Sequence, residues 1–239
     1  MKKMERIDKV VSNMGYGSRK EVKQYIKKGL IRVNDSVVRD NKLKVDPYKD
    51  LVTFDGEEII YKEFIYLMMN KPQGLVSSTE DPLTETVIDL LDERYSFYKP
   101  FPVGRLDKDT EGLVLISNDG KMAHELLSPK KRVDKKYYAE VYGLVEESHK
   151  DIFRNGIELD DGYKTLPAEL EIIESDIVSK VYLTIQEGKY HQVKRMFGAL
   201  SMRVVFLKRV SIGKLELDEN LKLGEYREIT EEEKNLLIE

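Results

Sequence analysis

The segment over residues 101–120 constrains the fold of this chain more than any other part of its sequence. An apolar start leads into Gly104-Arg-Leu-Asp107 and a polar run, and Gly112 then opens an apolar stretch that Asn118-Asp-Gly120 closes. This pattern predicts two strands joined by a loop that is crowded with ionisable groups. Such a loop is a common frame for reactive side chains, and an ordinary charged hairpin fits the pattern equally well.

The rest of the chain predicts an α+β protein with two domains, residues 1–60 and 61–239. In the first, the spacing predicts helices over 7–14 and 18–28, the second opened by a Ser18–Glu21 capping box and ended by Gly29. Two hairpins follow, around Asn34-Asp35 and Asp55-Gly56. Beyond them the pattern predicts strands over 64–69, 113–116, 135–141, 181–185, 204–207, 214–217 and 226–229, and helices over 86–91, 121–127 and 190–200.

Charge is distributed unevenly along the chain. Residues 1–49 hold fourteen Lys and Arg against six Asp and Glu, so the rest of a chain of net charge −4 has twelve more acidic than basic residues. A basic module on an acidic body indicates a partner that is a polyanion, although a charged helix by itself is usually only a solvated surface.

Several classes of protein are disfavoured by what the sequence lacks. There is no cysteine, no secretion signal and no apolar run of the ~20 residues that a membrane helix needs, so we expect a cytoplasmic protein with no membrane partner. The three histidines share no metal-ligand spacing, and dinucleotide, phosphate-loop and nucleophile-elbow motifs are missing. Any enzyme chemistry is therefore expected from ordinary side chains, with no metal and no cofactor.

Four short motifs of the first domain resemble the small RNA-binding module named after a small-subunit ribosomal protein, the alpha-L type. They are Arg6-Ile-Asp-Lys9, Gly17-Ser-Arg19, the turn over 26–29 and Val33-Asn-Asp-Ser-Val37. The resemblance implies that residues 1–60 contact structured RNA without reading its sequence. The side chains expected to make these contacts are basic: Arg6, Arg19, Lys20, Lys23, Lys27, Lys28 and Arg32.

Motifs of the second domain, taken in order, resemble the pseudouridine synthases of the ribosomal small-subunit type and their large-subunit relatives. The motifs are 70–74, 104–107 with 110–113, 135–138, 187–196, 207–209 with 212–213, and 223–227. The resemblance implies a mixed, mainly antiparallel sheet with flanking helices that isomerises uridine to pseudouridine in ribosomal RNA without a cofactor. The chain length, the Asp81-Pro82 segment and the sequence of the 187–196 motif favour small-subunit RNA. We also expect that this RNA is bound within a partly assembled subunit and that the enzyme is a monomer.

The same resemblance implies roles for three catalytic residues. Asp107 would be the catalytic carboxylate, acting on a uridine that is flipped out of its RNA. Lys194 would be the cation that keeps Asp107 ionised, with Arg195 as a possible substitute. Tyr137 would stack on the uracil, although the alternation of the strand alone suits Tyr138 equally well.

Four further residues would bind the substrate: Arg105, Leu207, Arg195 and Gln192. Leu207 would pack against the base, and Arg105 would hold the RNA backbone or fill the space that the flipped nucleotide leaves. Two other functions stay open: an RNA-binding or ribosome-assembly factor without catalysis, and a metal-dependent nuclease that uses the acidic cluster Asp107, Asp109 and Glu111. The target uridine and the chemical route of Asp107 also stay open.

Overall fold

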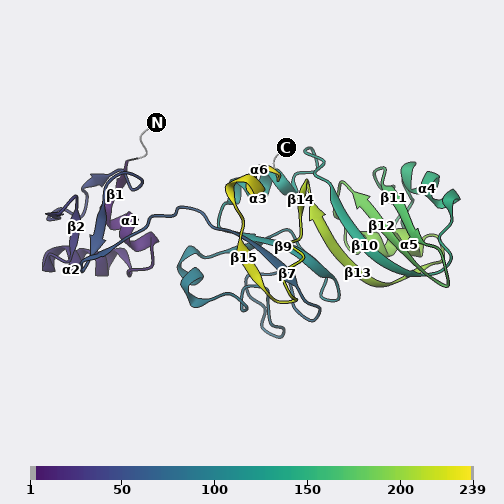
Figure 1. The fold of residues 1–239 in the computed structure, drawn as a ribbon, viewed down its shortest axis with the longest axis horizontal. Coiled ribbons are helices and arrows are strands. Elements are labelled where there is room, and N and C mark those ends of the chain that lie inside the picture. The colour runs from purple at the N-terminus through teal and green to yellow at the C-terminus, as the bar shows by residue number, and fades with distance from the viewer. Residues whose placement is uncertain (1–3, 238–239) are drawn as a thin grey trace. The chain divides into compact units, whose positions relative to one another are not determined.

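The computed structural model describes residues 4–237, which divide into two compact units (Figure 1). The first unit runs to Ile65 and also includes Leu91–Pro100, and the second comprises Tyr66–Leu90 and the chain from Phe101 onward. The predicted α+β class is confirmed. Over residues 4–237, none of the helices has the length and apolar character needed to cross a membrane.

The first unit combines two helices with two small sheets. Strand β1 pairs with β4, and a second sheet has the order β3-β2-β5-β6. The elements are β1 Glu5–Arg6, α1 Ile7–Asn13, α2 Arg19–Lys28, β2 Ile31–Val33, β3 Ser36–Val37, β4 Lys44–Val45, β5 Val52–Phe54 and β6 Glu57–Glu58. The predicted capping box is present, because Ser18 and Glu21 bond each other's backbone N–H, and Gly29 ends α2 in the left-handed conformation.

A segment from a distant part of the sequence completes this unit. Residues Leu91–Pro100 hold the 3₁₀ helix η1 (Glu93–Tyr98), and the rings of Phe97 and Tyr98 pack against the core of the first unit. That core is formed by the apolar faces of both helices and by the strands, with Ile7, Val10, Val11, Val22, Ile26 and Ile31 almost fully buried.

The second unit is built on a nine-stranded sheet with the order β11-β12-β10-β13-β9-β7-β15, to which β8 and β14 add at β9 and β13. The strands are β7 Tyr66–Lys71, β8 Phe101–Val103, β9 Glu111–Ser117, β10 Lys135–Tyr142, β11 Glu169–Glu174, β12 Val178–Ile185, β13 Arg203–Ile212, β14 Leu215–Glu216 and β15 Tyr226–Glu228. The ladder between β9 and β13 is parallel and the other ladders of this sheet are antiparallel, which agrees with the expected mixed, mainly antiparallel sheet.

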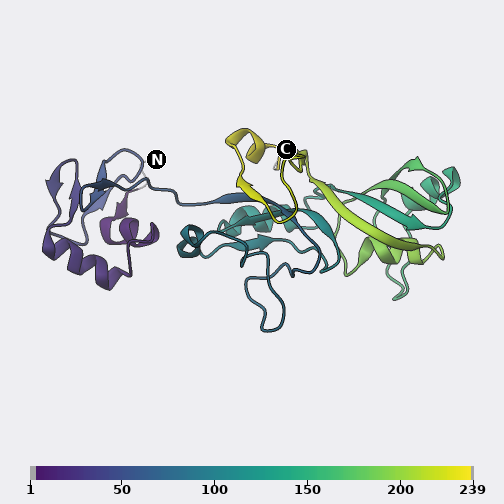
Figure 2. The same ribbon diagram turned by 60° about the horizontal axis from the view of Figure 1, so that its bottom comes forward.

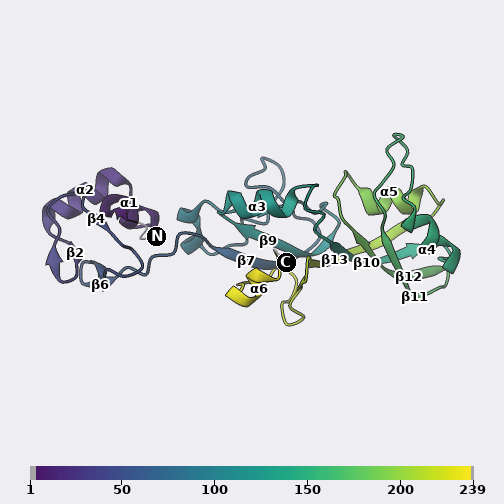
Figure 3. The ribbon, with the colours of Figure 1, turned by 90° about the horizontal axis from the view of Figure 1, so that it is seen from above.

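Three helices cover parts of this sheet. They are α3 Gly120–Leu127, α4 Glu147–Arg154 and α5 Gln192–Gly198, and a short α6 (Glu231–Asn235) follows β15. Figure 3 shows α3 and α5 on the same side of the sheet. Helix α4 packs beside α5, since the ring centroids of Phe153 and Phe197 are 5.0 Å apart. Between β7 and β8 the chain forms a long loop that stands out from the sheet (Figure 2).

The helix predicted over residues 86–91 is wrong, because this segment is a turn. The carboxylate of Asp89 accepts hydrogen bonds from the backbone N–H of Thr86 (2.7 Å) and from its hydroxyl (2.9 Å), and Thr86 also bridges to Val76. These side-chain bonds close a tight turn in place of a helical one. The sequence reasoning also missed α4 and β11, while the strand over 64–69 is confirmed as an internal strand of the sheet.

The parallel seam between β9 and β13 depends on Gly112. Gly112 pairs with Arg209 and has a φ of 102°, and a Cβ at this position would lie 2.2 Å from the Arg209 carbonyl oxygen. Only glycine permits this close approach of two backbones. The loop that precedes β9 is thereby brought next to the middle of β13.

We expect Gly112→Ala to lower the free energy of unfolding by about 3 kcal/mol or more, because the clash is with backbone atoms and the positive φ adds strain. Urea denaturation measures this loss. The control is Gly120→Ala at the start of α3, where a Cβ would meet nothing within 4 Å. Equal stability of the two variants would contradict the role given to the seam.

Candidate active site

The buried ammonium of Lys71, the last residue of β7, holds the loop over residues 104–110 by hydrogen bonds to its backbone. Lys71 is 0% exposed, and its Nζ donates to the carbonyl oxygens of Pro72 (3.0 Å), Asp107 (3.1 Å) and Thr110 (2.9 Å). A cation that is taken from water needs such partners. The backbone of the loop is therefore wrapped around a single charged group.

Burial lowers the pKa of Lys71 to about 8, and the nearby carboxylates of Asp107, Asp109 and Glu111 oppose this decrease. At neutral pH the side chain still carries its proton and its charge. The buried ammonium of Lys71 thus lies close to the carboxylates of Asp107, Asp109 and Glu111.

Further hydrogen bonds fix the loop on both sides of Asp107. The hydroxyl of Ser77 accepts from the N–H of Leu106 (3.1 Å) and donates to the carbonyl of the same residue (3.2 Å). The N–H of Thr110 donates to the carbonyl of Asp107 (3.0 Å), and that of Gly74 donates to the carbonyl of Lys108 (2.8 Å). The backbone at Asp107 is consequently held rigidly while its carboxylate stays 30% exposed.

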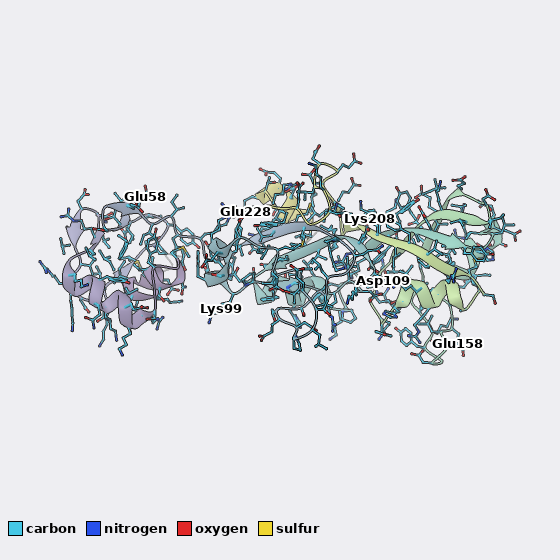
Figure 4. All side chains as sticks on the ribbon, turned by 90° about the horizontal axis from the view of Figure 1, so that it is seen from below. Glu58, Lys99, Asp109, Glu158, Lys208 and Glu228 are labelled. Atoms are coloured by element: carbon cyan, nitrogen blue, oxygen red, sulfur yellow. The ribbon has the colours of Figure 1, made fainter. Side chains whose placement is uncertain are left out.

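Two basic groups from the start of α5 lie beside this carboxylate. Lys194 Nζ is 3.4 Å from Asp107 Oδ2, and His191 Nε2 is 3.6 Å from Asp107 Oδ1. Lys194 also donates to Asp109 Oδ1 at 2.5 Å, and this hydrogen bond lowers the pKa of Asp109 below its ordinary value. Figure 4 labels Asp109 on this loop. A nearby ammonium favours the ionised form of a carboxyl group.

Asp107 lines a small pocket beside the sheet. Its walls come from the loop, from β10, β12 and β13, from the segment before α5 and from the first turn of α5: Arg105, Leu106, Asp107, Thr110, Tyr137, Ile185, Gly188, Lys189, His191, Gln192, Val193 and Leu207. Tyr137 and Leu207 are buried, at 8% and 5% exposure, and Arg105 is exposed. The structure thus brings together Asp107, Tyr137, Leu207 and Arg105.

The choice between Tyr137 and Tyr138 follows from the alternation of β10. Tyr137 lines the pocket with Asp107. Tyr138 packs edge-on against the rings of Tyr182 and Phe206, and its hydroxyl bonds Glu140. Because adjacent residues of a strand point to opposite faces, only one of the two tyrosines can share the pocket.

Gln192 and Arg195 are expected to bind the substrate, but in the structure their side chains bond other groups of the protein. The amide of Gln192 is 4% exposed, accepts from the N–H of Lys189 (2.9 Å) and donates to Glu187 Oε1 (2.8 Å), so it braces the turn at the pocket rim. Arg195 forms ion pairs with Asp160 and with Asp161 (2.7 Å). Lys194, and not Arg195, is therefore the neighbour of Asp107.

The basic residues predicted to bind RNA lie on the first unit. Arg19, Lys20, Lys23, Lys27 and Lys28 of α2, and Arg32 of β2, have exposed side chains. Arg6 differs, because its guanidinium bonds both oxygens of the buried Asp8 at 3.0 and 2.6 Å.

Sequence reasoning missed Lys71 and His191 as members of the site. Lys71 lies in the 70–74 motif, but nothing in the sequence marks a lysine that ends an apolar strand as buried. His191 lies in the 187–196 motif, which by itself assigns this histidine no role. Within residues 4–237, no group of three or more His, Asp or Glu side chains is arranged to hold a metal ion.

Comparisons with known proteins cover nearly the whole chain. Residues 65–199 match the RNA pseudouridylate synthase family, and residues 5–48 match the S4 domain. An uncharacterized RNA pseudouridine synthase of Bacillus subtilis is 53% identical over 98% of both chains, and ribosomal small subunit pseudouridine synthase A of Vibrio cholerae is 42% identical over 95% of this chain and 97% of its own. A crystal structure of a pseudouridylate synthase matches with a TM-score of 0.68 at 37% identity, covering 97% of this chain and 99% of the other.

We expect Lys71→Met to lower the free energy of unfolding by about 3 kcal/mol, because it leaves several buried carbonyl oxygens without a donor. Chemical denaturation measures the effect. Lys108→Met is the control, since this lysine is exposed on the same loop and its loss should change stability by no more than about 0.5 kcal/mol. Similar stability of the two variants would show that the loop does not depend on the ammonium.

Proposed function

The chain belongs to the RNA pseudouridylate synthase family, and from this premise we propose that it converts a specific uridine of ribosomal RNA to pseudouridine. The names of its relatives support a small-subunit target, as do Asp81-Pro82 and the 187–196 motif. The observation that carries the proposal is the Asp107 carboxylate, held beside Lys194 at the mouth of a pocket that Tyr137 and Leu207 line.

The reaction is an isomerisation that exchanges one bond of the ribose for another. The bond between the anomeric carbon and N1 of uracil breaks, the base turns, and a bond forms between the anomeric carbon and carbon 5. The proton on carbon 5 is lost, and N1 gains a proton. Atoms and electrons balance without an oxidant or a cofactor.

We assign the catalytic role to Asp107 as an ionised carboxylate. It can attack carbon 6 of the ring, attack the anomeric carbon, or remove a ribose proton to give a glycal, and each route requires the charged form. The ammonium of Lys194 lies 3.4 Å from this carboxylate. The rigid backbone around Asp107 supports a fixed position for the attacking oxygen.

The pocket fits a base that has left its stack in the RNA. Flipping a uridine costs a few kcal/mol, and contacts inside the enzyme must offset this cost. We propose that Tyr137 stacks on the uracil, that Leu207 packs on it, and that exposed Arg105 holds the RNA backbone at the rim or fills the vacated space. Tyr137 lines the same pocket as Asp107, and we propose that it takes part in removing the proton from carbon 5.

We further propose that Gln192 acts on the substrate through the turn that it braces, and that Arg195 meets RNA outside the pocket. Residues 1–60 would form the RNA-binding module and residues 61–239 the catalytic domain. The basic surface of α2 would bind phosphates and keep ribosomal RNA, in a partly assembled small subunit, close to a monomeric enzyme in the cytoplasm.

We expect Asp107→Asn to abolish pseudouridine formation and to leave RNA affinity nearly unchanged, because the amide keeps the size of the side chain and loses its charge. Tritium release from RNA labelled at carbon 5 of uridine measures turnover. The control is Asp109→Asn, which also removes a carboxylate bonded to Lys194 and should retain most of the activity.

Normal turnover by Asp107→Asn would remove Asp107 from its assigned role. If the wild-type protein releases no tritium from any ribosomal RNA, and RNA binding remains, a non-catalytic factor would explain the chain better. Strand cleavage that a chelator stops would instead indicate a nuclease.

We expect the triple variant K20Q/K23Q/K27Q to weaken RNA binding about tenfold and to flatten its salt dependence, by about 0.7–0.9 in log Kd against log salt for each lost phosphate contact. Saturating activity should be unchanged. The variant K42Q/K44Q/K49Q makes the same charge change elsewhere on the module and is the control. Equal losses in both variants would indicate attraction by overall charge and not a surface on α2.

A further inference from the structure

Three buried side-chain atoms of residues 4–237 lack a hydrogen-bond partner: Asn70 Oδ1, Thr110 Oγ1 and Arg209 Nη2. Such atoms are few in folded proteins, and each calls for an explanation. Of the three residues, Thr110 lines the pocket of Asp107, whereas Asn70 lines a different groove beside Lys208. Arg209 lines neither. The unpaired hydroxyl of Thr110 therefore belongs to the site where a substrate would bind.

Two hydrogen bonds hold the backbone of Thr110 in place beside the pocket. Its N–H donates to the carbonyl of Asp107 (3.0 Å), and its carbonyl accepts from the buried ammonium of Lys71 (2.9 Å). The residue is 1% exposed. Because Thr110 lines the pocket of Asp107, a molecule bound in that pocket can supply the partner that Oγ1 lacks.

The chemistry of that partner follows from the other walls. Tyr137 and Leu207 offer an aromatic and an aliphatic surface, which suit the faces of a planar base. The polar atoms of uracil lie on its edge, at O2, N3–H and O4. A threonine hydroxyl can donate to a carbonyl oxygen or accept from N–H, so it can bond any of these atoms.

We propose that Thr110 is a substrate-binding residue whose Oγ1 hydrogen-bonds the polar edge of the flipped uracil. The inference rests on the function proposed above and extends it from the carboxylate to the recognition of the base. It also addresses a requirement of the reaction. Once the glycosidic bond is broken, the base must turn inside the pocket without leaving, and a hydroxyl that donates and accepts can bond the edge before and after this rotation.

The test compares Thr110→Val, which keeps the shape and removes the hydroxyl, with Thr110→Ser, which keeps the hydroxyl. We expect single-turnover conversion by the valine variant to be roughly 10- to 100-fold slower, the effect of losing one substrate hydrogen bond, while the serine variant stays within about threefold of the wild type. The melting temperature of Thr110→Val should be unchanged or higher, because an unpaired buried hydroxyl is removed. A lower melting temperature for Thr110→Val than for Thr110→Ser would assign the hydroxyl to structure, and equal loss of activity in both variants would show that the hydroxyl is not what matters; either result would overturn the inference.

Substrate analogues provide a second and independent measurement. RNAs that carry 2-thiouridine, 4-thiouridine or 3-methyluridine at the target weaken one polar atom of the edge at a time. If Thr110 bonds that atom, the substitution slows the wild-type enzyme more than it slows Thr110→Val. Equal slowing of both enzymes by all three analogues would overturn the inference.

The two proposals fail in distinguishable ways. Full activity of Thr110→Val on unmodified RNA, beside an active wild type, would overturn only the role of Thr110 and leave the isomerase function standing. Absence of pseudouridine after incubation of the wild type with ribosomal RNA would overturn the proposed function, and the role of Thr110 with it.

Discussion

The buried ammonium of Lys71 joins the sheet to the loop that carries the reactive carboxylate. A lysine without solvent must satisfy its three N–H donors, and here the carbonyl oxygens of Pro72 and of two loop residues, Asp107 and Thr110, do so. The backbone of Asp107 is thus held by hydrogen bonds of main-chain atoms. The Asp107 side chain stays 30% exposed, and Lys194 forms ion pairs with both Asp107 and Asp109.

The charges near the pocket are divided between two neighbouring residues of one helix. Lys194 lies with the two aspartates of the loop, and Arg195 lies with Asp160 and Asp161. A shift of one residue along α5 turns a side chain by about 100°, so adjacent basic residues serve different surfaces. The carboxylate that we propose as catalytic therefore meets a single ammonium, flexible on its aliphatic stem, and not a rigid guanidinium.

Much of this fold could be predicted from patterns that depend on local physics. The capping box at Ser18, the end of α2 at Gly29 and the helix that begins near Gly120 all follow from the needs of unpaired backbone groups. Local signals could not distinguish the turn at Thr86 from a helix, because a threonine and an aspartate three residues apart suit a closed turn as well as the first turn of a helix. Strand β11 was missed because its exposed edge position gives it a mixed, weakly apolar sequence.

Some residues of the site could likewise be predicted from the sequence, and others could not. Asp107, Tyr137 and Leu207 could be proposed because their motifs occur together in order, and the structure brings them to one pocket. The burial of Lys71 and the unpaired hydroxyl of Thr110 depend on contacts between segments distant in sequence, which no periodicity reports. The packing of Phe97 and Tyr98 on the first unit has a similar origin, and it makes the chain pass between the two units three times. Cleavage of the chain near residue 62 would therefore leave the N-terminal fragment bound to residues 91–100. A catalytic fragment that lacks the N-terminal residues would expose the rings of Phe97 and Tyr98, and such an apolar surface promotes aggregation.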